Sequence, residues 1–403
     1  MRRLGYDGDC WPDELQTALL RVALCDPDTA IREWQALHPK LALDDVWDAE
    51  IQRLLPLVRH NLTAAGVDAD DDFARMRGIQ RRTWFENQRR IHQVAPTLAQ
   101  LQAAGVEPVL LKGLPLALLY YEDLSLRPMA DVDVLIPYDT YDLVLDLLEA
   151  DGWRDVLDIP RDRRRRMYHG AGMTHPDGRS LDVHWQLALP FVLPHAEAES
   201  NDDFFRAAVP VDVDELHLAT LGPADMLLHL VVHGLWSGSS ANVRWCADAT
   251  TVVRHAGDDL DWDRVLDQTV RRDLVIPVSN GLRFIEDVCD APVPARVINE
   301  LAKVEVPRRT RRAYRLILQD PSGPAVLGGL RGTQAYWARQ SAKWGPLRAA
   351  RELPAFLQDN WNLERPSQVP VEAVRKAVKR IRKIGQPDHD PDVDTEELTG
   401  ARQ

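Results

Sequence analysis

The sequence predicts a mixed α/β protein in which a small β-sheet is flanked by extensive helical segments. Two observations support this fold class. Apolar residues recur at three- and four-residue spacing before residue 104 and again beyond Gly222, as in helices buried on one face. Between these stretches lie short apolar runs bounded by Gly, Pro or Asp, which are typical of strands. We therefore expect a helical unit over residues 1–104, an α/β core over 105–221, a helical unit over 222–384 and a disordered acidic tail over 385–403.

Length and composition are those of an ordinary globular chain. Of the 403 residues, 45% are hydrophobic and 28% are charged, which argues against a fibrous or disordered protein. No apolar run reaches the roughly 18 residues that cross a bilayer, and the first residues lack the apolar core of a signal peptide. We therefore expect a cytoplasmic protein without membrane contact. The scattered cysteines predict neither a zinc site nor a disulfide: Cys10, Cys25, Cys246 and Cys289.

The net charge limits the choice of partners. A formal charge of −13 disfavours a general nucleic-acid-binding protein, because such proteins neutralise phosphates with Lys and Arg. Two basic runs are local exceptions, at residues 161–166 and 375–383. Each has two interpretations, a solvated helix face, which is the commoner case, or a surface for phosphate or RNA.

The predicted core begins with a buried strand at residues 109–112. A helix at 114–121, a strand at 131–136 and a helix at 138–150 follow it. Two more strands, at 167–175 and 180–187, flank the turn Pro176-Asp177-Gly178-Arg179, where Asp and Gly tolerate the left-handed conformations of a tight hairpin. These elements predict a small mixed sheet with helices.

Asp131 and Asp133 are the first candidate metal ligands. Side chains alternate between the two faces along a strand, so both carboxylates lie on one face while Val132 and Val134 enter the core. Two adjacent carboxylates repel each other unless a cation lies between them, and oxygen ligands suit Mg²⁺. The alternative is a strand with a solvated edge.

Asp182 supplies a third carboxylate on a later strand, where His184 shares its face. Two-metal chemistry uses such a carboxylate as a bridging ligand or as a base, although a half-exposed strand aspartate is the alternative. Lys112 and Gly113 lie between a strand and a helix, where backbone N–H groups and a lysine can bind a triphosphate.

The order Gly113, Asp131 with Asp133, and Asp182 resembles the polymerase-beta-like nucleotidyltransferase superfamily. That superfamily has a glycine turn after its first strand, then a D-x-D strand and a third acidic strand. More closely, the chain is similar to a bacterial family of uncharacterised nucleotidyltransferases over roughly residues 85–290. The similar segments are VLLKGLPLALLYYEDLSLRPMADVDVLI, SLDVHWQL, HLVVHGLW and VRWCADATTVV. One departure is Leu114, because the superfamily usually has serine or glycine after the first glycine.

The resemblance implies an enzyme that moves a nucleoside monophosphate from a nucleoside triphosphate to an acceptor hydroxyl of a small molecule, peptide or glycan precursor. It implies two Mg²⁺ ions on Asp131 and Asp133, with Asp182 as third carboxylate. Nucleotide contacts are implied for Lys112, Gly113 and Arg127, and a structural pairing of Arg127 with the aspartates is an equal alternative. Toxin-like transfer to RNA or protein, and a catalytically silent scaffold, are the competing functions.

The C-terminal helical region adds two pairs of polar residues, and the two members of each pair lie about one helical turn apart. His229 and His233 form the first pair, for which a structural role is more common than metal binding. Arg244 and Asp248 match the R-W-x-x-D segment of the family, and either line the cleft or form an intrahelical ion pair. Together with His184, we treat Arg244 and Asp248 as candidate cleft-lining residues.

Overall fold

The computed structural model describes residues 11–41, 49–67, 71–157, 159–187, 201–235, 243–318 and 330–384. The acidic tail expected at 385–403 lies outside these residues. Contacts between the residues group the chain into one compact unit up to Ala349 and a second one from Ala350. The first unit contains the β-sheet and the helices that surround it. The division at residues 104, 221 and 384 stays a prediction.

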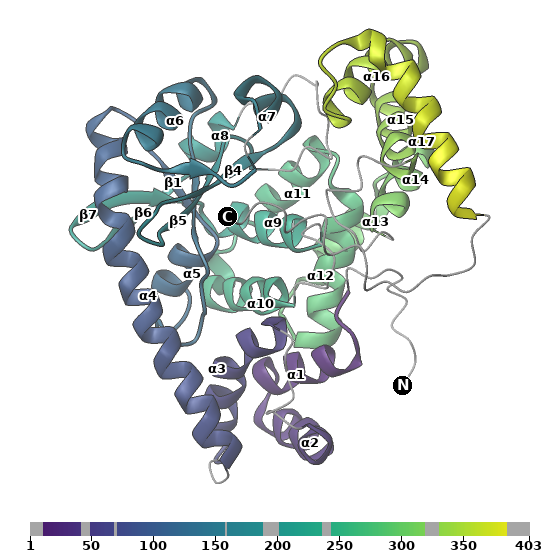
Figure 1. The fold of residues 1–403 in the computed structure, drawn as a ribbon. Coiled ribbons are helices and arrows are strands. Elements are labelled where there is room, and N and C mark those ends of the chain that lie inside the picture. The colour runs from purple at the N-terminus through teal and green to yellow at the C-terminus, as the bar shows by residue number, and fades with distance from the viewer. Residues whose placement is uncertain are drawn as a thin grey trace. The chain divides into compact units, whose positions relative to one another are not determined.

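The described residues before the sheet form mainly helices, as the sequence predicts (Figure 1). Helix α1 begins with a capping box, in which the Asp13 carboxylate accepts from the Gln16 backbone and the Gln16 side chain accepts from the Asp13 N–H. Helix α3 packs between α1 and the long α4, which runs beside the sheet. Their bounds are α1 (Glu14–Leu24), α2 (Pro27–Leu37), α3 (Ala49–Ala64) and α4 (Asp71–Ala103).

The sheet is mixed and has seven strands in the order β3-β4-β5-β2-β1-β7-β6. Its central strand β2 pairs parallel with β5 and antiparallel with β1, and β1 pairs parallel with β7. The expected mixed sheet is therefore confirmed. The strands are β1 (Val109–Leu111), β2 (Val132–Leu135), β3 (Arg154–Asp155), β4 (Gly170–Thr174), β5 (Ser180–His184), β6 (Val209–Val213) and β7 (Leu216–Thr220).

Three of these strands, β3, β6 and β7, were not expected from the sequence. Strands β6 and β7 form a hairpin whose turn begins at Asp214, with φ 55° in the left-handed region. No glycine marks this turn, and aspartate is one of the few other residues that adopt that conformation readily. The strand expected at 167–175 is also shorter, because Met167 ends helix α7 and β4 begins at Gly170.

The two faces of the sheet pack against different helices. Val132 and Val134 belong to a buried cluster with residues of α4 and α6. Leu135 belongs instead to a second cluster, which includes residues of α1, α3, α9, α10 and α12. Because side chains alternate along β2, Asp133 lies on the face of Leu135, and that face is turned toward the helices of the second cluster.

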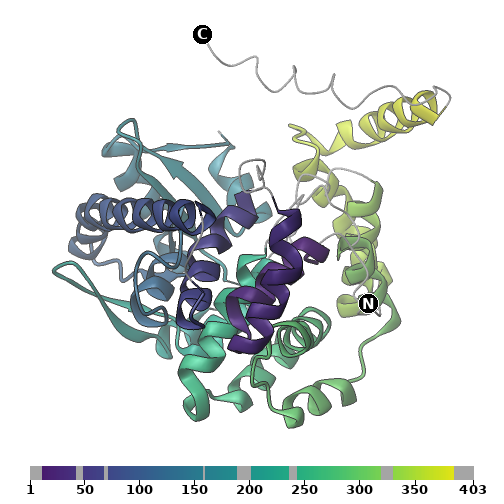
Figure 2. The same ribbon diagram turned by 90° about the horizontal axis from the view of Figure 1, so that it is seen from below.

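The remaining helices complete the fold. Helix α9 packs against α10, α11 and α12, and α1 packs against α10 and α12, so the N-terminal and C-terminal helices share one core (Figures 1 and 2). None of the described helices is long and apolar enough to cross a membrane. Cys25, Cys246 and Cys289 are buried free thiols.

The bounds of these helices are α5 (Gly113–Leu119), α6 (Tyr141–Ala150), α7 (Arg161–Met167), α8 (Asp202–Arg206), α9 (Pro223–Gly234), α10 (Arg244–Ala256), α11 (Trp262–Arg271), α12 (Val275–Cys289), α13 (Ala295–Lys303), α14 (Arg308–Leu318), α15 (Leu330–Trp344), α16 (Pro346–Asn360) and α17 (Val369–Ile384).

Candidate functional site

A cavity of about 200 Å³ lies in the first unit, between the sheet and the helices of the second buried cluster. Its sheet wall carries Lys112, Gly113, Asp131, Asp133 and Asp182. A helical wall comes from α3, α9 and α10 and contributes Arg53, Leu230, His233, Arg244, Trp245 and Asp248, and the loop before β2 adds Arg127 and Ala130. The cavity thus joins carboxylates of the sheet to arginines of the helices and the loop.

The register of the sheet brings two of the three carboxylates together, and the third, Asp131, lines the same cavity. Asp133 and Asp182 are direct partners in the parallel pairing of β2 with β5, and Asp131 comes immediately before β2. Asp133, Asp182 and His184 each offer a ligand atom, and these atoms lie within 4.8 Å of one another. Among the described residues, these three side chains form the one group of His, Cys, Asp or Glu residues that is close enough together to hold a metal ion. Its carboxylate oxygens suit Mg²⁺.

The three carboxyl groups have different electrostatic environments. Burial raises the pKa of Asp131, and the neighbouring charges of Asp133 and Asp182 raise it further. Burial also disfavours the ionised form of Asp133, but Lys112 and His184 outweigh it and hold that pKa well below its ordinary value. His184 similarly lowers the pKa of Asp182 against the effect of burial. Asp131 is therefore the one of these three carboxyl groups whose pKa is raised.

Lys112 lies against the carboxylates. Its Nζ is 2.7 Å from Oδ1 of Asp133, and its side chain is largely buried. The Lys112 backbone has φ 46°, in the left-handed region that residues other than glycine rarely adopt. Such strain concentrates at functional sites, where the surrounding structure enforces it.

His184 is buried beside the carboxylates and does not line the cavity. Its Nε2 donates to Oδ1 of Asp133 at 3.1 Å and lies 3.7 Å from Oδ2 of Asp182. Burial and Lys112 oppose a charge on this imidazole, yet the two carboxylates raise its pKa overall. His184 therefore orients the carboxylates of Asp133 and Asp182 without itself lining the cavity.

Arg127 forms a buried ion pair with Asp248 of α10. Its Nε and Nη2 donate to the two carboxylate oxygens of Asp248 at 3.2 and 2.7 Å, and the Tyr121 hydroxyl donates to the same carboxylate at 2.8 Å. The contacts of Arg127 are therefore those of a structural ion pair, one of the two alternatives from the sequence, and its partner is Asp248. Gly113 leaves room for this arginine, because a Cβ there would lie 2.8 Å from Nη1 of Arg127.

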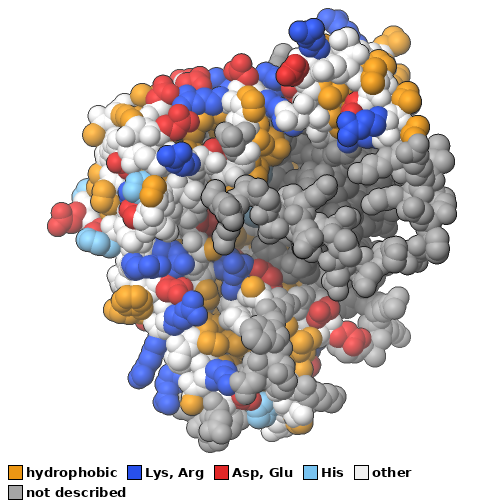
Figure 3. Space-filling view, in the orientation of Figure 1, with side chains coloured by type: hydrophobic (Ala, Val, Ile, Leu, Met, Phe, Trp, Pro, Cys, Tyr) orange, Lys and Arg blue, Asp and Glu red, His pale blue; other side chains and the backbone are white. Residues whose placement is uncertain are grey.

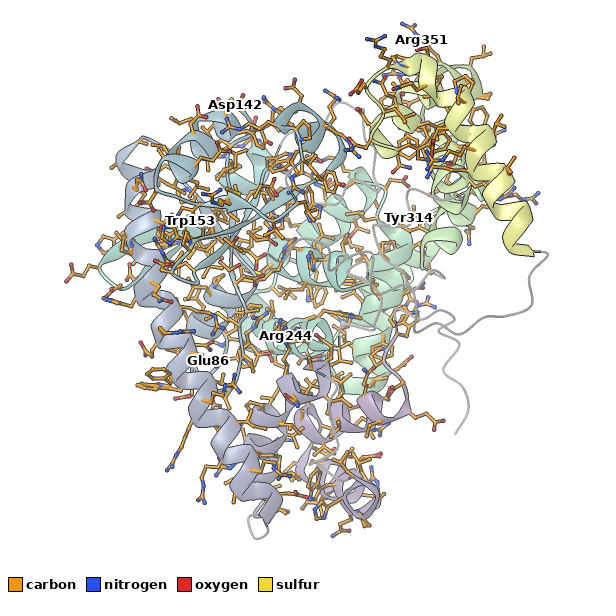
Figure 4. The ribbon with its side chains drawn as sticks, in the orientation of Figure 1. Glu86, Asp142, Trp153, Arg244, Tyr314 and Arg351 are labelled. Carbon is orange, nitrogen blue, oxygen red and sulfur yellow. The ribbon has the colours of Figure 1, made fainter. Side chains whose placement is uncertain are left out.

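Arg244 holds the loop that precedes β2. Its Nη1 donates to the Pro128 carbonyl oxygen, and Figure 4 shows it on α10. Burial and the nearby charge of Arg127 lower its pKa to about 10. On the same loop, Asn87 of α4 donates to the carbonyl oxygens of Leu124 and Arg127. These contacts fix the loop that carries Asp131.

The histidine pair of α9 fits a structural role. The ring centroids of His229 and His233 are 5.6 Å apart, and burial lowers the pKa of each well below its ordinary value. His233 lines the cavity and His229 does not. Neither belongs to the group of metal-ligating side chains among the described residues.

The cavity also contains residues that sequence reasoning missed, Arg53, Ala130, Leu230 and Trp245. Arg53 lies on α3, far before the first strand, and on the sequence alone it resembles any surface arginine of an amphipathic helix. Trp245 lies against Gly234 of α9, where a Cβ would come within 2.0 Å of its ring. Only long-range packing reveals these positions.

The arginine run of α7 is largely paired with acidic side chains. Arg164 is buried against Asp155, and Arg161 pairs with Asp146 and Glu149. Arg165 lies 3.3 Å from Asp142. Acidic and basic side chains are accordingly mixed over the upper left of Figure 3, where Figure 1 shows α6 and α7. This pattern favours a solvated helix face over an RNA-binding surface.

Comparisons with known proteins identify a family for most of the first unit. The sequence model of a family described as uncharacterised nucleotidyltransferase matches residues 46–290, which include α3, the sheet and α9 to α12. Among solved structures, an antigenic nucleotidyltransferase-like protein from Paracoccidioides brasiliensis is 12% identical, with a TM-score of 0.34. That similarity covers 52% of this chain and 96% of the other. No curated protein matches.

Proposed function

The chain belongs to the family of uncharacterised nucleotidyltransferases, and from that premise we propose that it performs Mg²⁺-dependent nucleotidyl transfer in the cavity. A nucleoside monophosphate would move from a nucleoside triphosphate to an acceptor hydroxyl, with pyrophosphate as the other product. The observation that carries this proposal is the convergence of Asp131, Asp133 and Asp182 on one cavity wall. The assignment to the polymerase-beta-like superfamily is part of the proposal.

The side chains present fit a hard divalent cation. Asp131, Asp133 and Asp182 offer carboxylate oxygens, and the raised pKa of Asp131 reflects negative charge that a cation would relieve. We propose these residues as the ligands of two Mg²⁺ ions. When bound, Mg²⁺ supplies charge neutralisation on the transferred phosphate and on the leaving pyrophosphate.

The residues of the chain divide the remaining work. Asp182 is the more exposed of the paired carboxylates, with 34% of its side chain accessible against 6% for Asp133. We assign it to orient the acceptor hydroxyl and accept its proton as the oxygen attacks the α-phosphorus and the bond to pyrophosphate breaks. His184 keeps Asp133 and Asp182 aligned, and Lys112 is placed to meet the phosphates.

A small molecule, peptide or glycan precursor is the acceptor class that we propose, in the cytoplasm. Two observations favour it over RNA. The cavity holds about 200 Å³, and Arg161, Arg164 and Arg165 of α7 are paired with local carboxylates. The arginines of α7 therefore do not favour the toxin-like function.

Product analysis tests the proposal. The protein is incubated with Mg²⁺ and each nucleoside triphosphate in turn, with a metabolite extract as the source of acceptor, and pyrophosphate and labelled products are measured. We expect pyrophosphate release that requires Mg²⁺ and disappears in the Asp133→Asn variant. A wild-type protein that binds no nucleotide and releases no pyrophosphate above the level of Asp133→Asn is instead a scaffold with a nucleotidyltransferase fold.

A further inference from the structure

We propose that Arg53 and Arg244 form a subsite for the polyphosphate of the donor nucleotide, on the cavity wall that the helices build. The inference rests on the proposed function, because it assigns part of the same cavity to the same substrate. It adds a role for α3, a helix of the N-terminal segment in which the sequence identified no functional residue. The family match begins at residue 46 and includes this helix.

The charges that line the cavity are sorted by wall. Two ion pairs are internal, Lys112 with Asp133 and Arg127 with Asp248. Outside these pairs, the lining carboxylates are Asp131 and Asp182, on the sheet side. The other lining cations are Arg53 and Arg244, on the helical side. A metal-bound polyphosphate has the complementary pattern, with its cation at the carboxylates and its anionic oxygens toward the guanidinium groups.

Arg244 connects the two walls. Its hydrogen bond to the Pro128 carbonyl oxygen fixes it beside the loop that carries Asp131. Arg53 lines the same cavity from α3, so an anion held there can accept hydrogen bonds from both guanidinium groups.

Arg53 has N–H donors to offer to a phosphate beside its present partner. Its Nη1 pairs with Glu50, one turn earlier on α3, and 33% of the arginine side chain is exposed against 13% for Glu50. A guanidinium group has five N–H donors, so Arg53 can keep the Glu50 contact and still donate to a phosphate. Arginine also matches phosphate oxygens with two parallel N–H donors, which a single ammonium group cannot do.

The start of α5 gives a reason why the helices must supply these donors. Leu114 follows Gly113 and is fully buried in the core behind the sheet, so this position offers no hydroxyl to a phosphate. Lys112 adds one cation from the sheet side, where it also pairs with Asp133 at 2.7 Å. A triphosphate carries several negative charges, and Arg53 and Arg244 are further lining cations that the helices supply.

Calorimetric titration with two probes tests the subsite. Inorganic tripolyphosphate in EDTA reports binding by the cations of the chain without metal, and a non-hydrolysable nucleoside triphosphate with Mg²⁺ reports the complete site. The variants are Arg53→Gln, which changes a partly exposed side chain, and Arg244→Lys, which keeps the charge but removes the two-pronged donor. The control is Arg82→Gln on α4, which removes one positive charge at a side chain that is 78% exposed and outside the cavity.

We expect Arg53→Gln and Arg244→Lys to weaken the binding of both probes by about tenfold, the effect of losing a charge-assisted hydrogen bond to phosphate. Arg82→Gln should bind like wild type. Unchanged binding of both probes by folded Arg53→Gln protein overturns the subsite, even where pyrophosphate release continues and the proposed function stands. Weakened tripolyphosphate binding in a protein that never releases pyrophosphate supports the subsite and removes the proposed function.

Discussion

Two groups of polar side chains in the first unit show opposite electrostatic arrangements around a carboxylate, Asp203 in one and Asp131 in the other. Around α8 and α11, Asp203 accepts hydrogen bonds from Gln268, Arg271 and Arg272. These donors lower its pKa against the effect of burial. At the cavity, Asp131 has a raised pKa, because it is buried near Asp133 and Asp182. In the first group, arginine and amide donors of the protein compensate the charge of Asp203. In the second group, the negative charge near Asp131 is only partly compensated.

The difference separates a structural role from a functional one. A carboxylate that arginines and amides fully satisfy stabilises the fold and has no need of a ligand. Crowded carboxylates reduce stability, and they are retained where an external cation completes them. The comparison predicts that substitutions in the first group affect stability, and that those in the second affect activity.

The largest expected effect is on catalysis. Asp131→Asn and Asp133→Asn keep the shape of the side chain but remove a negative charge from the proposed metal ligands. Turnover should fall by at least about a hundredfold in steady-state pyrophosphate release. Asp182→Asn should lose turnover similarly while it still binds nucleotide with Mg²⁺. The control is Asp263→Asn, an exposed carboxylate on α11, and an equal loss in that variant would contradict the assignment.

A smaller effect is expected in the first group. Asp203→Asn removes the charge that two arginines and Gln268 contact, so the free energy of unfolding should fall by about 2 kcal/mol. Urea denaturation measures this change. Turnover per folded molecule should stay at the wild-type level, since Asp203 does not line the cavity. A folded variant with lost turnover would show that the two groups are coupled.

The smallest effect is a pH dependence of opposite sign for Asp131 and Asp203. The pKa of Asp131 in the folded protein lies above its ordinary value of 3.8, so its favourable contribution exists at low pH and is lost as the pH rises through the folded pKa. The pKa of Asp203 is lowered, so its contribution exists above that ordinary value and is lost as the pH falls.

The stability of variants measures these signs directly. In EDTA, replacing Asp131 with Asn should raise the free energy of unfolding relative to wild type by more at about pH 7 than at about pH 4. Asp133→Asn should not share this gain, because Lys112 would lose its buried partner. The sequence alone predicts relief of repulsion for both substitutions, and the Lys112 contact distinguishes them. A gain for Asp131→Asn that is independent of pH would contradict the repulsion.

Local patterns in the sequence predicted the carboxylate wall. Alternation along a strand is enough to place Val132 and Val134 in the core and Asp133 on the opposite face, and the structure shows that arrangement. The hairpin at Gly178 also followed from its residues. In contrast, β6 and β7 lack the glycine that marks most tight turns, so local chemistry did not identify them.

The helical wall depended on contacts that no local pattern encodes. Asp248 lies 121 residues from its partner Arg127, and the expected alternatives for Asp248 were cleft lining or a pair within its own helix. Arg53 and Trp245 reach the cavity only because α1, α3 and α10 pack in one core. Their residue types are common on helices, so their roles become visible only in the folded chain.

Binding of a divalent cation in the absence of nucleotide tests the central claim most directly. Mn²⁺ serves as a paramagnetic substitute for Mg²⁺, and the free ion is measured by electron paramagnetic resonance. Wild type and Asp263→Asn should bind Mn²⁺ saturably and alike, whereas Asp131→Asn and Asp133→Asn should bind at least about tenfold more weakly. Equal Mn²⁺ binding by wild type and both variants, or none by wild type, would contradict the claim that the crowded carboxylates form a metal site.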